Sequence, residues 1–419
     1  VLYSMEGAIM KVLIAFPNKL DLDFFVNEIS YLKKHFDRIV VISYYGDKSK
    51  YDEIAKRYDL EYFMVKENSW LNFLNINIFK WLFSKDVIRE IKKNCSFSHK
   101  GIKKFARIIY YGLFYIYSKK FILKELKSNS DNQIYLYSFW LADGAYTVSN
   151  FYDLKSKYNI KKIFSRAHRY DLYIERNKLN YIPFRTYIDC HLDEIHFISE
   201  DGLRYYESHI SSNKKPKKFV SRLGTSNPNG IRKKIYSKDT ITIGSCALIT
   251  QVKRLDLIID VLSKIPYNFH WIHIGDGIMG NEIKKYAAKK LPSGSFEFLG
   301  YLSNEKILDV YSQYDVDFFI NLSDSEGIPV SIMEAMSIGI PVIARDVGGT
   351  REIVNPTNGL LLKEPLEENF DEKIIEFMKH RLDNIEYYKH LSNNCLKIWK
   401  DQYNLEKNSE MFIKKILEE

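Results

Sequence analysis

Short apolar runs alternate with longer amphipathic segments along the chain, and this alternation predicts a regular succession of strands and helices. In the first half we expect strands at residues 11–16, 38–43, 133–137, 162–165 and 194–198, and helices at 22–35 and 144–158. A polar run at 211–218 is the best candidate for a linker. The pattern then restarts, with strands at 219–222, 241–246, 270–274, 296–299, 316–321, 341–344 and 359–362, and helices at 255–263, 280–290, 304–313 and 329–337.

Apolar strands that alternate with helices are typical of a parallel sheet covered by helices on both faces. Because the pattern occurs twice, we expect an α/β protein with two Rossmann-like doubly wound domains that face each other across a cleft. The expected boundaries are 1–215 for the first domain, 216–395 for the second, and 396–419 for a final helix that crosses back to the first. Ligands of such sheets bind beyond the carboxyl ends of the strands.

The composition is that of an ordinary globular protein, since 46% of the 419 residues are hydrophobic and 27% are charged. This excludes a mainly disordered chain. The four cysteines (Cys95, Cys190, Cys246 and Cys395) form no clustered motif, so neither a disulfide framework nor a zinc site is expected, and a reducing compartment fits best. The start of the chain lacks the pattern of a secretory signal.

The positive charge is concentrated in one segment. The chain has a net charge of +9, and residues 80–127 alone carry 13 basic against 3 acidic residues, together with many aromatic side chains. The longest uncharged run there, 108–118, has 11 residues, whereas a membrane-spanning helix needs about 20. We therefore expect this basic aromatic insert (70–127) to lie on an anionic membrane surface, with Trp81, Phe105, Phe114 and Tyr117 at headgroup depth. The alternative is a helical pair whose aromatic side chains pack into the first domain and whose lysines are solvated. No motif supports nucleic acid as the partner.

The segment that follows the expected strand 316–321 carries the most informative chemistry. Gly327 lets the backbone approach a ligand closely, and Pro329 suits the first position of a helix. The N–H groups of Val330 and Ser331 would then point out of the helix end and favour an anion.

Two acidic residues flank this helix start. Glu326 lies just before it, and Glu334 lies eight residues further on, about two helical turns inside. Carboxylates at these places can accept hydrogen bonds from the vicinal hydroxyls of a ribose or a hexose. Glu326 could instead merely stabilise the helix dipole, and Glu334 could be an exposed helix residue.

The spacing of Glu326 and Glu334 resembles the E-x7-E element of retaining glycosyltransferases of the GT-B fold, and the chain resembles glycosyltransferase family 4. Further similar segments, at 222–225, 246–254, 274–277, 300–302 and 341–349, follow in the family's order over residues 220–362. In the first half, 137–144 and 165–173 resemble the members that build bacterial surface polysaccharides.

The resemblance implies a site, and each role comes from that resemblance. The first domain would bind the acceptor and the second the nucleotide sugar, with Lys253 and Arg254 at the leaving diphosphate. Arg254 would replace an arginine for which this chain has Leu248, and the family's Gly-rich loop after the first strand is absent at 16–19. The implied catalytic residues are His168, Lys253 and Glu326; the implied donor-binding residues are Arg254, Gly275, Asp276, Gly277, Tyr301, Leu302, Gly327, Ile328, Pro329, Val330, Ser331 and Glu334; and the acceptor-side candidates are Arg166 and Asp171.

The resemblance implies a retaining transferase that moves a hexose, from a UDP-linked donor, to a growing glycan such as a lipid-linked precursor of a capsule or other surface polysaccharide. No metal or other cofactor is expected, because Lys253 and the helix end would neutralise the diphosphate. The expected location is cytoplasmic, at the inner face of the cell membrane. The alternatives are a nucleotide-sugar 2-epimerase on the same fold and a non-catalytic partner subunit.

Overall fold

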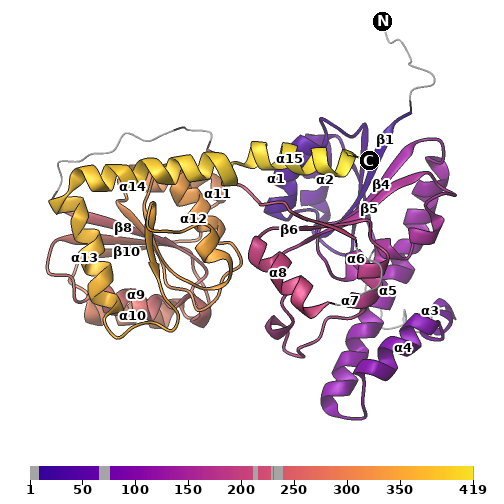
Figure 1. Cartoon of the computed structure of the whole chain (residues 1–419), viewed down its shortest axis with the longest axis horizontal. Helices are drawn as coiled ribbons and strands as arrows, with labels where there is room; N and C mark the ends of the chain where they lie inside the picture. Colours follow the sequence, from indigo (N-terminus) through magenta and orange to yellow (C-terminus); the bar gives the residue numbers. More distant parts are fainter. Residues whose placement is uncertain (1–8, 66–75, 211–215, 228–229, 231–238, 419) are drawn as a thin grey trace, which may run out of the picture. The chain divides into compact units, whose positions relative to one another are not determined.

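The computed structural model describes residues 9–65, 76–210, 216–227, 230 and 239–418. The chain divides into two compact units (Figure 1): Val1–Ser221 with Ser409–Glu419 form unit 1, and Arg222–Asn408 form unit 2. Within the described ranges, no helix combines the length and the apolar character that crossing a bilayer requires.

Unit 1 is built on a seven-stranded parallel sheet of order β3-β2-β1-β4-β5-β6-β7. The order reverses between β1 and β4, which makes their carboxyl ends the switch point of this sheet. The strands are β1 (Lys11–Asn18), β2 (Arg38–Ser43), β3 (Glu61–Met64), β4 (Gln133–Ser138), β5 (Ile160–Ala167), β6 (Glu194–Phe197) and β7 (Lys217–Val220).

Helices cover both faces of this sheet, because successive strand residues point to opposite sides. Val12, Ile14 and Phe16 pack with the helices of one layer, whereas Leu13 and Ala15 pack with those of the other. The first layer contains α3 (Ile76–Leu82), α4 (Lys85–Asn94), α5 (His99–Ser128), α6 (Asp143–Ser149), α7 (Arg185–Cys190) and α8 (Glu200–His209); the second contains α1 (Asp23–Leu32), α2 (Lys48–Tyr58) and the end of α15 (Leu405–Leu417).

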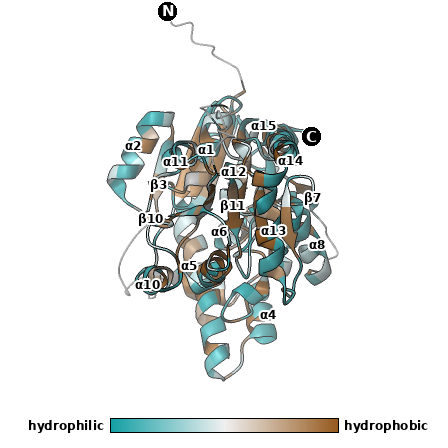
Figure 2. Ribbon diagram, turned by 90° about the vertical axis from the view of Figure 1, so that its left-hand side faces the viewer, coloured by the Kyte–Doolittle hydropathy of each residue, from teal (hydrophilic) through white to brown (hydrophobic). Residues whose placement is uncertain are grey.

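Unit 2 has a six-stranded parallel sheet of order β10-β9-β8-β11-β12-β13, with its switch point between β8 and β11. Its strands are buried and hydrophobic, whereas exposed helices such as α2 and α4 of unit 1 are largely hydrophilic (Figure 2). The elements of unit 2 are β8 (Ile241–Cys246), α9 (Leu255–Leu262), β9 (Phe269–Ile274), α10 (Gly280–Lys290), β10 (Phe296–Gly300), α11 (Asn304–Gln313), β11 (Phe318–Asn321), α12 (Val330–Ser337), β12 (Val342–Arg345), β13 (Gly359–Leu362), α13 (Phe370–Asp383) and α14 (Ile385–Ile398).

The prediction of two parallel α/β units is confirmed, but three local predictions are wrong. The strand expected at 219–222 was assigned to the second domain, whereas β7 pairs with β6 in the first sheet. Residues 217–218 of the expected linker belong to that strand, and 211–215 lie outside the described residues. The helix expected at 144–158 ends at Ser149, where the amide of Asn150 bonds the Tyr146 carbonyl, and a 3-10 turn follows at Tyr152–Leu154.

The basic insert forms three helices, α3, α4 and α5, that pack on one another in unit 1 (Figure 1), and its first residues, 70–75, lie outside the described ranges. Of the predicted membrane aromatics, Phe105 is 37% exposed and Tyr117 is partly buried against the core of unit 1. Trp81 and Phe114 are buried in the unit 1 core, so their assignment to a membrane surface is wrong. Phe114 is buried because it lies on the core-facing side of α5, which has the 3.6-residue repeat of a packed helix. Trp81 lies on α3, where its ring N–H donates to the Tyr146 hydroxyl at 2.8 Å.

Candidate active site

The switch point of unit 2 brings two of the predicted residues together. Lys253 ends the short turn after β8, and Glu326 lies in the loop after the neighbouring β11. The Lys253 Nζ lies 2.6 Å from Oε1 of Glu326, and the Asn321 side-chain amide donates to the same oxygen at 3.3 Å. Glu326 is 7% exposed, whereas Lys253 keeps a quarter of its side chain accessible. A cation and a carboxylate are thus held at the place where such sheets bind ligands.

The loop that carries Glu326 depends on two glycines after β12. Gly349 N–H donates to the Gly327 carbonyl at 2.8 Å. Gly348 has φ +55°, and a Cβ there would lie 2.0 Å from the Glu326 carbonyl oxygen. Only glycine allows this approach, so the 348–349 pair fixes the position of the Glu326 backbone.

The loop leads into α12, as the sequence predicts. Pro329 is the N-cap residue, and Val330 and Ser331 open the helix with N–H groups that have no carbonyl one turn before them. Gly327, Val330 and Ser331 are partly exposed, whereas Ile328 and Pro329 are buried. Because backbone N–H groups at a helix start favour negative charge, this end can hold an anion beside Lys253.

Glu334 lies on α12, one helical turn after Val330, and is 9% exposed. Burial alone raises the pKa of its carboxyl to about 7. Its charge also helps burial to raise the pKa of the Cys246 thiol, at the end of β8, to about 12. Within the described chain, no donor or cation pairs with the Glu334 carboxylate. A buried acceptor of this kind is suited to a ligand hydroxyl, since a bond to the ligand would replace the lost hydration.

Glu334 therefore makes the stability of the free protein depend on pH. Its native pKa is raised from 4.5 to about 7, so the native state binds more protons than the unfolded state, and the free energy of unfolding falls as pH rises from 5 to 8. Relative to Glu334→Gln, which does not titrate, the wild type should lose about 2.5 kcal/mol over this range. Urea unfolding of both proteins at pH 5 and pH 8 measures this difference. A gap between wild type and variant that stays constant with pH would contradict the burial of an unpaired carboxyl.

Arg254 contacts other carboxylates than Lys253 does. Its guanidinium donates to Asp256 at 2.9 Å and to Asp324 at 3.2 Å, and these two carboxylates raise its pKa. Its positive charge is therefore already compensated within the protein. Lys253 is the cation that contacts Glu326, and the structure shows no such contact for Arg254.

Sequence reasoning missed Arg345 at the end of β12. It is 8% exposed, binds both oxygens of Glu364 at 2.6 and 2.9 Å, and donates to the Leu322 carbonyl at 3.1 Å and to Asp324. Arg345 thus ties the loop after β11 to the neighbouring strand. The signal was present in the sequence, as an arginine that ends an otherwise apolar strand.

The remaining predicted donor residues lie at the carboxyl end of β9 and beyond β10. Gly275 has φ +130° and its N–H donates to the Gly300 carbonyl at 2.8 Å. Asp276 and Gly277 are exposed, and Tyr301, just after Gly300, is 77% exposed. Leu302 is partly buried against the core of unit 2. The exposed Tyr301 ring is free to stack on a planar ligand group.

In unit 1, His168 follows β5 at the carboxyl edge of the sheet. Its ring packs beside those of Phe139 and Trp140, with centroids 4.7 and 4.4 Å away, and is 7% exposed. Neither ring nitrogen has a hydrogen-bond partner among the described residues, and Nδ1 is 3.7 Å from the Asp171 carboxylate. The neighbouring rings thus fix the orientation of the histidine, and the described residues leave the hydrogen-bonding capacity of both ring nitrogens unused.

The two acceptor-side candidates are buried and paired within the protein. Arg166 is 1% exposed, forms an ion pair with Glu28 at 2.9 Å, and lies over the Phe412 ring at 3.9 Å. Asp171 is 2% exposed and accepts from the backbone N–H groups of Leu141 at 2.6 Å and His168 at 2.9 Å. Arg166 pairs with Glu28 and not with Asp171, and burial leaves neither side chain open to an acceptor.

Another polar pair at the switch point of unit 1 was missed. Asn18, the last residue of β1, donates to the buried Asp143 carboxylate at 3.3 Å, and burial raises the pKa of that carboxyl. Tyr110 of α5 partly offsets that rise in the pKa of Asp143. In sequence, this pair was hidden because Asn18 and Asp143 are 125 residues apart. No group of three potential metal ligands occurs in either unit over the described ranges.

Solved structures show the same fold. The lipopolysaccharide outer core galactosyltransferase WaaB superposes with a TM-score of 0.66 at 15% identity, covering 97% of this chain and all of that one. Sucrose-phosphate synthase from Thermosynechococcus elongatus gives a TM-score of 0.66 at 11% identity, covering 97% of this chain and 98% of that one. The two units are therefore the Rossmann-like domains of a GT-B fold, as the sequence predicts.

Sequence comparison identifies the family. The model of "Glycosyl transferases group 1" matches residues 229–397. The O-antigen biosynthesis glycosyltransferase WbnH of Escherichia coli is 33% identical over 142 residues, which span 34% of this chain and only 37% of that protein. The uncharacterized glycosyltransferase MJ1178 of Methanocaldococcus jannaschii is 30% identical over 270 residues, which span 64% of this chain and 70% of that protein. This chain is therefore a member of the group 1 glycosyltransferase family.

Proposed function

We propose that the protein is a retaining, metal-independent glycosyltransferase of family 4 that moves a hexose from a UDP-linked donor to a growing surface polysaccharide. The observation that carries this proposal is the pairing of Lys253 and Glu326 at the switch point of unit 2, one helix start away from the unpaired Glu334. The Lys253 ammonium and the start of α12 suit the diphosphate of a nucleotide sugar, and the buried Glu334 carboxylate suits its hydroxyl groups.

Each group has a defined task in this proposal. Lys253 and the N–H groups of Val330 and Ser331 stabilise the negative charge that grows on the diphosphate as the glycosidic bond breaks. Glu334 accepts hydrogen bonds from the ribose, and Glu326 from the hexose. His168 donates a hydrogen bond to the donor sugar near its reacting carbon. The acceptor hydroxyl attacks from the face that the diphosphate leaves, and a diphosphate oxygen takes its proton.

Surface polysaccharide as the product is supported by relatives whose names concern such polymers. WbnH acts in O-antigen biosynthesis, and a relative from Erwinia amylovora is named an amylovoran biosynthesis glycosyltransferase. UDP as the donor nucleotide is supported by a fold relative from Anabaena that was solved with UDP-glucose.

The test of the mechanism is a proton NMR assay with UDP-glucose, UDP-galactose and their N-acetylated forms as donors, run with and without EDTA. We expect transfer or slow hydrolysis to release the sugar first as the α-anomer, at the same rate with EDTA. First release as the β-anomer would contradict retention, and loss of activity that added Mg²⁺ restores would contradict metal independence.

A lipid-linked acceptor implies a place at a membrane, and unit 1 has a surface suited to one. We define the α3–α5 tip as the exposed apolar residues Phe79, Phe83, Phe97, Ile102 and Phe105. Phe83 is 76% exposed and Phe97 is fully exposed, so these rings bury little surface in the protein. The same helices carry Lys85, Lys92 and Lys93 on α4 and Lys100 and Lys103 on α5, and all five lysines are exposed. Basic and aromatic side chains together favour an anionic bilayer surface.

We expect the protein to sediment with vesicles that contain phosphatidylglycerol and not with pure phosphatidylcholine vesicles. The double variant Lys100→Glu, Lys103→Glu should weaken this binding by about tenfold or more, since each lysine near an anionic surface contributes about 1 kcal/mol. The matched control is Lys124→Glu, Lys127→Glu, which changes the same charge on α5 far from the tip. Equal binding to both lipids would contradict the membrane proposal.

A further inference from the structure

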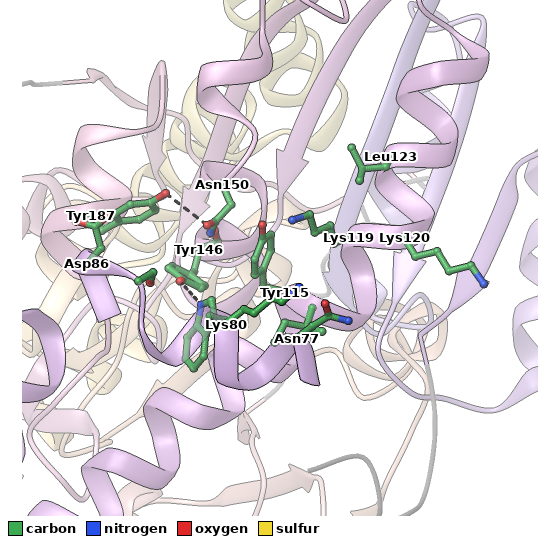
Figure 3. A pocket seen from close by; sticks show the side chains of 13 residues that line it. Asn77, Lys80, Asp86, Tyr115, Lys119, Lys120, Leu123, Tyr146, Asn150 and Tyr187 are labelled. Carbon is green, nitrogen blue, oxygen red and sulfur yellow. Dashed lines mark hydrogen bonds between the residues drawn. The ribbon is translucent and has the colours of Figure 1, made fainter. Parts of the chain in front are cut away.

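A pocket of about 610 Å³ lies in the helical layer of unit 1, apart from the carboxyl edge of the sheet (Figure 3). Its walls come from α3, the second half of α5, the end of α6 and α7. Its volume lies within the range of about 300–1,000 Å³ that is typical of small-molecule sites. The lining residues are Asn77, Lys80, Trp81, Ser84, Asp86, Tyr115, Ile116, Lys119, Lys120, Leu123, Tyr146, Asn150 and Tyr187.

The charge of this pocket is positive. Three lysines, Lys80, Lys119 and Lys120, line it against one carboxylate, Asp86. None of the three lysines forms an ion pair with another described residue. The Lys119 Nζ lies 5.4 Å from the centre of the Tyr115 ring, and both Lys80 and Lys119 extend toward the space beside that ring (Figure 3). Two uncompensated ammonium groups that converge on one space favour an anionic ligand.

The opposite wall is aromatic and firmly held. The Tyr146 ring is 6.2 Å from that of Tyr115 and 5.6 Å from that of Tyr187. The Tyr146 hydroxyl accepts from Trp81 at 2.8 Å, and the Tyr187 hydroxyl donates to the side chain of Asn150 at 3.4 Å. Aromatic rings beside amides and hydroxyls provide both an apolar face and hydrogen bonds, which is what the two faces and the rim of a sugar ring require.

We propose that this pocket binds an acidic saccharide, with its carboxylate or phosphate at Lys80 and Lys119 and its ring against Tyr115. This inference rests on the proposed function, since it assigns the pocket to a distal part of the acceptor glycan. His168 and Asp143 mark the reacting edge of unit 1, so the pocket is a second contact rather than the acceptor's reaction site. A second contact keeps the glycan bound to the enzyme and raises the effective concentration of its reacting end at the reaction site.

The test uses calorimetric titration of the full chain with two soluble hexasaccharides. The acidic probe is a hyaluronan hexasaccharide, in which every second sugar is a glucuronate, and the neutral probe is chitohexaose. We expect binding of the acidic probe and at least about tenfold weaker binding of the neutral one, because charge-assisted hydrogen bonds are lost. The variant Lys80→Glu, Lys119→Glu should lose the acidic probe, whereas Lys124→Glu, Lys127→Glu should keep it.

The control lysines are exposed residues of α5 that do not line the pocket. Equal binding of the acidic probe by both double variants would overturn the proposal. A second contrary outcome is that neither saccharide binds and that only the Lys80→Glu, Lys119→Glu variant loses binding to phosphatidylglycerol vesicles. That outcome would overturn the saccharide proposal in favour of a lipid headgroup. UDP titration of the same samples separates these outcomes from the proposed function, since UDP should bind unit 2 in every variant.

Discussion

Lys253→Ala should lower the turnover number with saturating UDP-sugar by about 10²–10³-fold, the loss seen when one preorganised donor to a developing charge is removed. In the proposed mechanism the ammonium stabilises the departing diphosphate more strongly than the bound donor, because charge accumulates as the bond breaks. The Michaelis constant for the donor should therefore change much less than the turnover number. Steady-state kinetics over a range of donor concentrations measure both.

Two matched variants make this result specific. Lys306→Ala removes an exposed lysine of α11 and should leave the kinetics unchanged. Lys253→Arg keeps the charge and should retain more activity than Lys253→Ala. Because Lys253 also pairs with the buried Glu326, thermal unfolding of each variant must accompany the kinetics. A Lys253→Ala protein that is folded and as active as the wild type would contradict the assignment of the diphosphate site.

Arg166→Met should destabilise unit 1 by about 3–5 kcal/mol at neutral pH, the cost of leaving the partner of a buried ion pair without its counter-charge. That partner is Glu28, which is 3% exposed and whose pKa is raised by burial, while the Arg166 charge lowers it. Without the arginine, the carboxyl must either stay charged in the core or take up a proton. Urea unfolding at pH 7 measures the loss.

The double variant Glu28→Gln, Arg166→Met is the control for this interpretation. It removes both charges and should recover most of the lost stability, since only the unpaired charge is costly. If Arg166 instead contacts the acceptor, the single variant will remain stable and will fail in transfer to an acceptor. That outcome would restore the sequence-based assignment and contradict the buried role.

The elements around the donor site could be predicted because their signals are local. The run from 316 to 337 contains a strand, a glycine, a proline and a periodic helix within about twenty residues, and the structure forms β11 and α12 there. The pairing of Lys253 with Glu326 follows from the neighbouring positions of β8 and β11, which the parallel topology implies.

What could not be predicted depends on distant partners. The resemblance assigned Arg166 and Asp171 to the acceptor side, but their partners Glu28, Phe412 and Leu141 come from other parts of the chain. Helix α2 was overlooked because its sequence is mostly polar and only Tyr51 is fully buried, although Tyr51, Ile54, Ala55 and Tyr58 have helical spacing. Trp81 looked like an interfacial anchor because its hydrogen bond to Tyr146 spans 65 residues.

The most direct test of the central claim is a screen for nucleotide release from UDP-, GDP- and ADP-linked hexoses. We expect that a UDP-hexose is turned over and that the products are free UDP and a transferred or hydrolysed sugar. We also expect the Glu334→Gln and Lys253→Ala variants to be impaired. Release of no nucleotide from any donor, or conversion of the donor to a sugar isomer without an acceptor, would contradict the central claim.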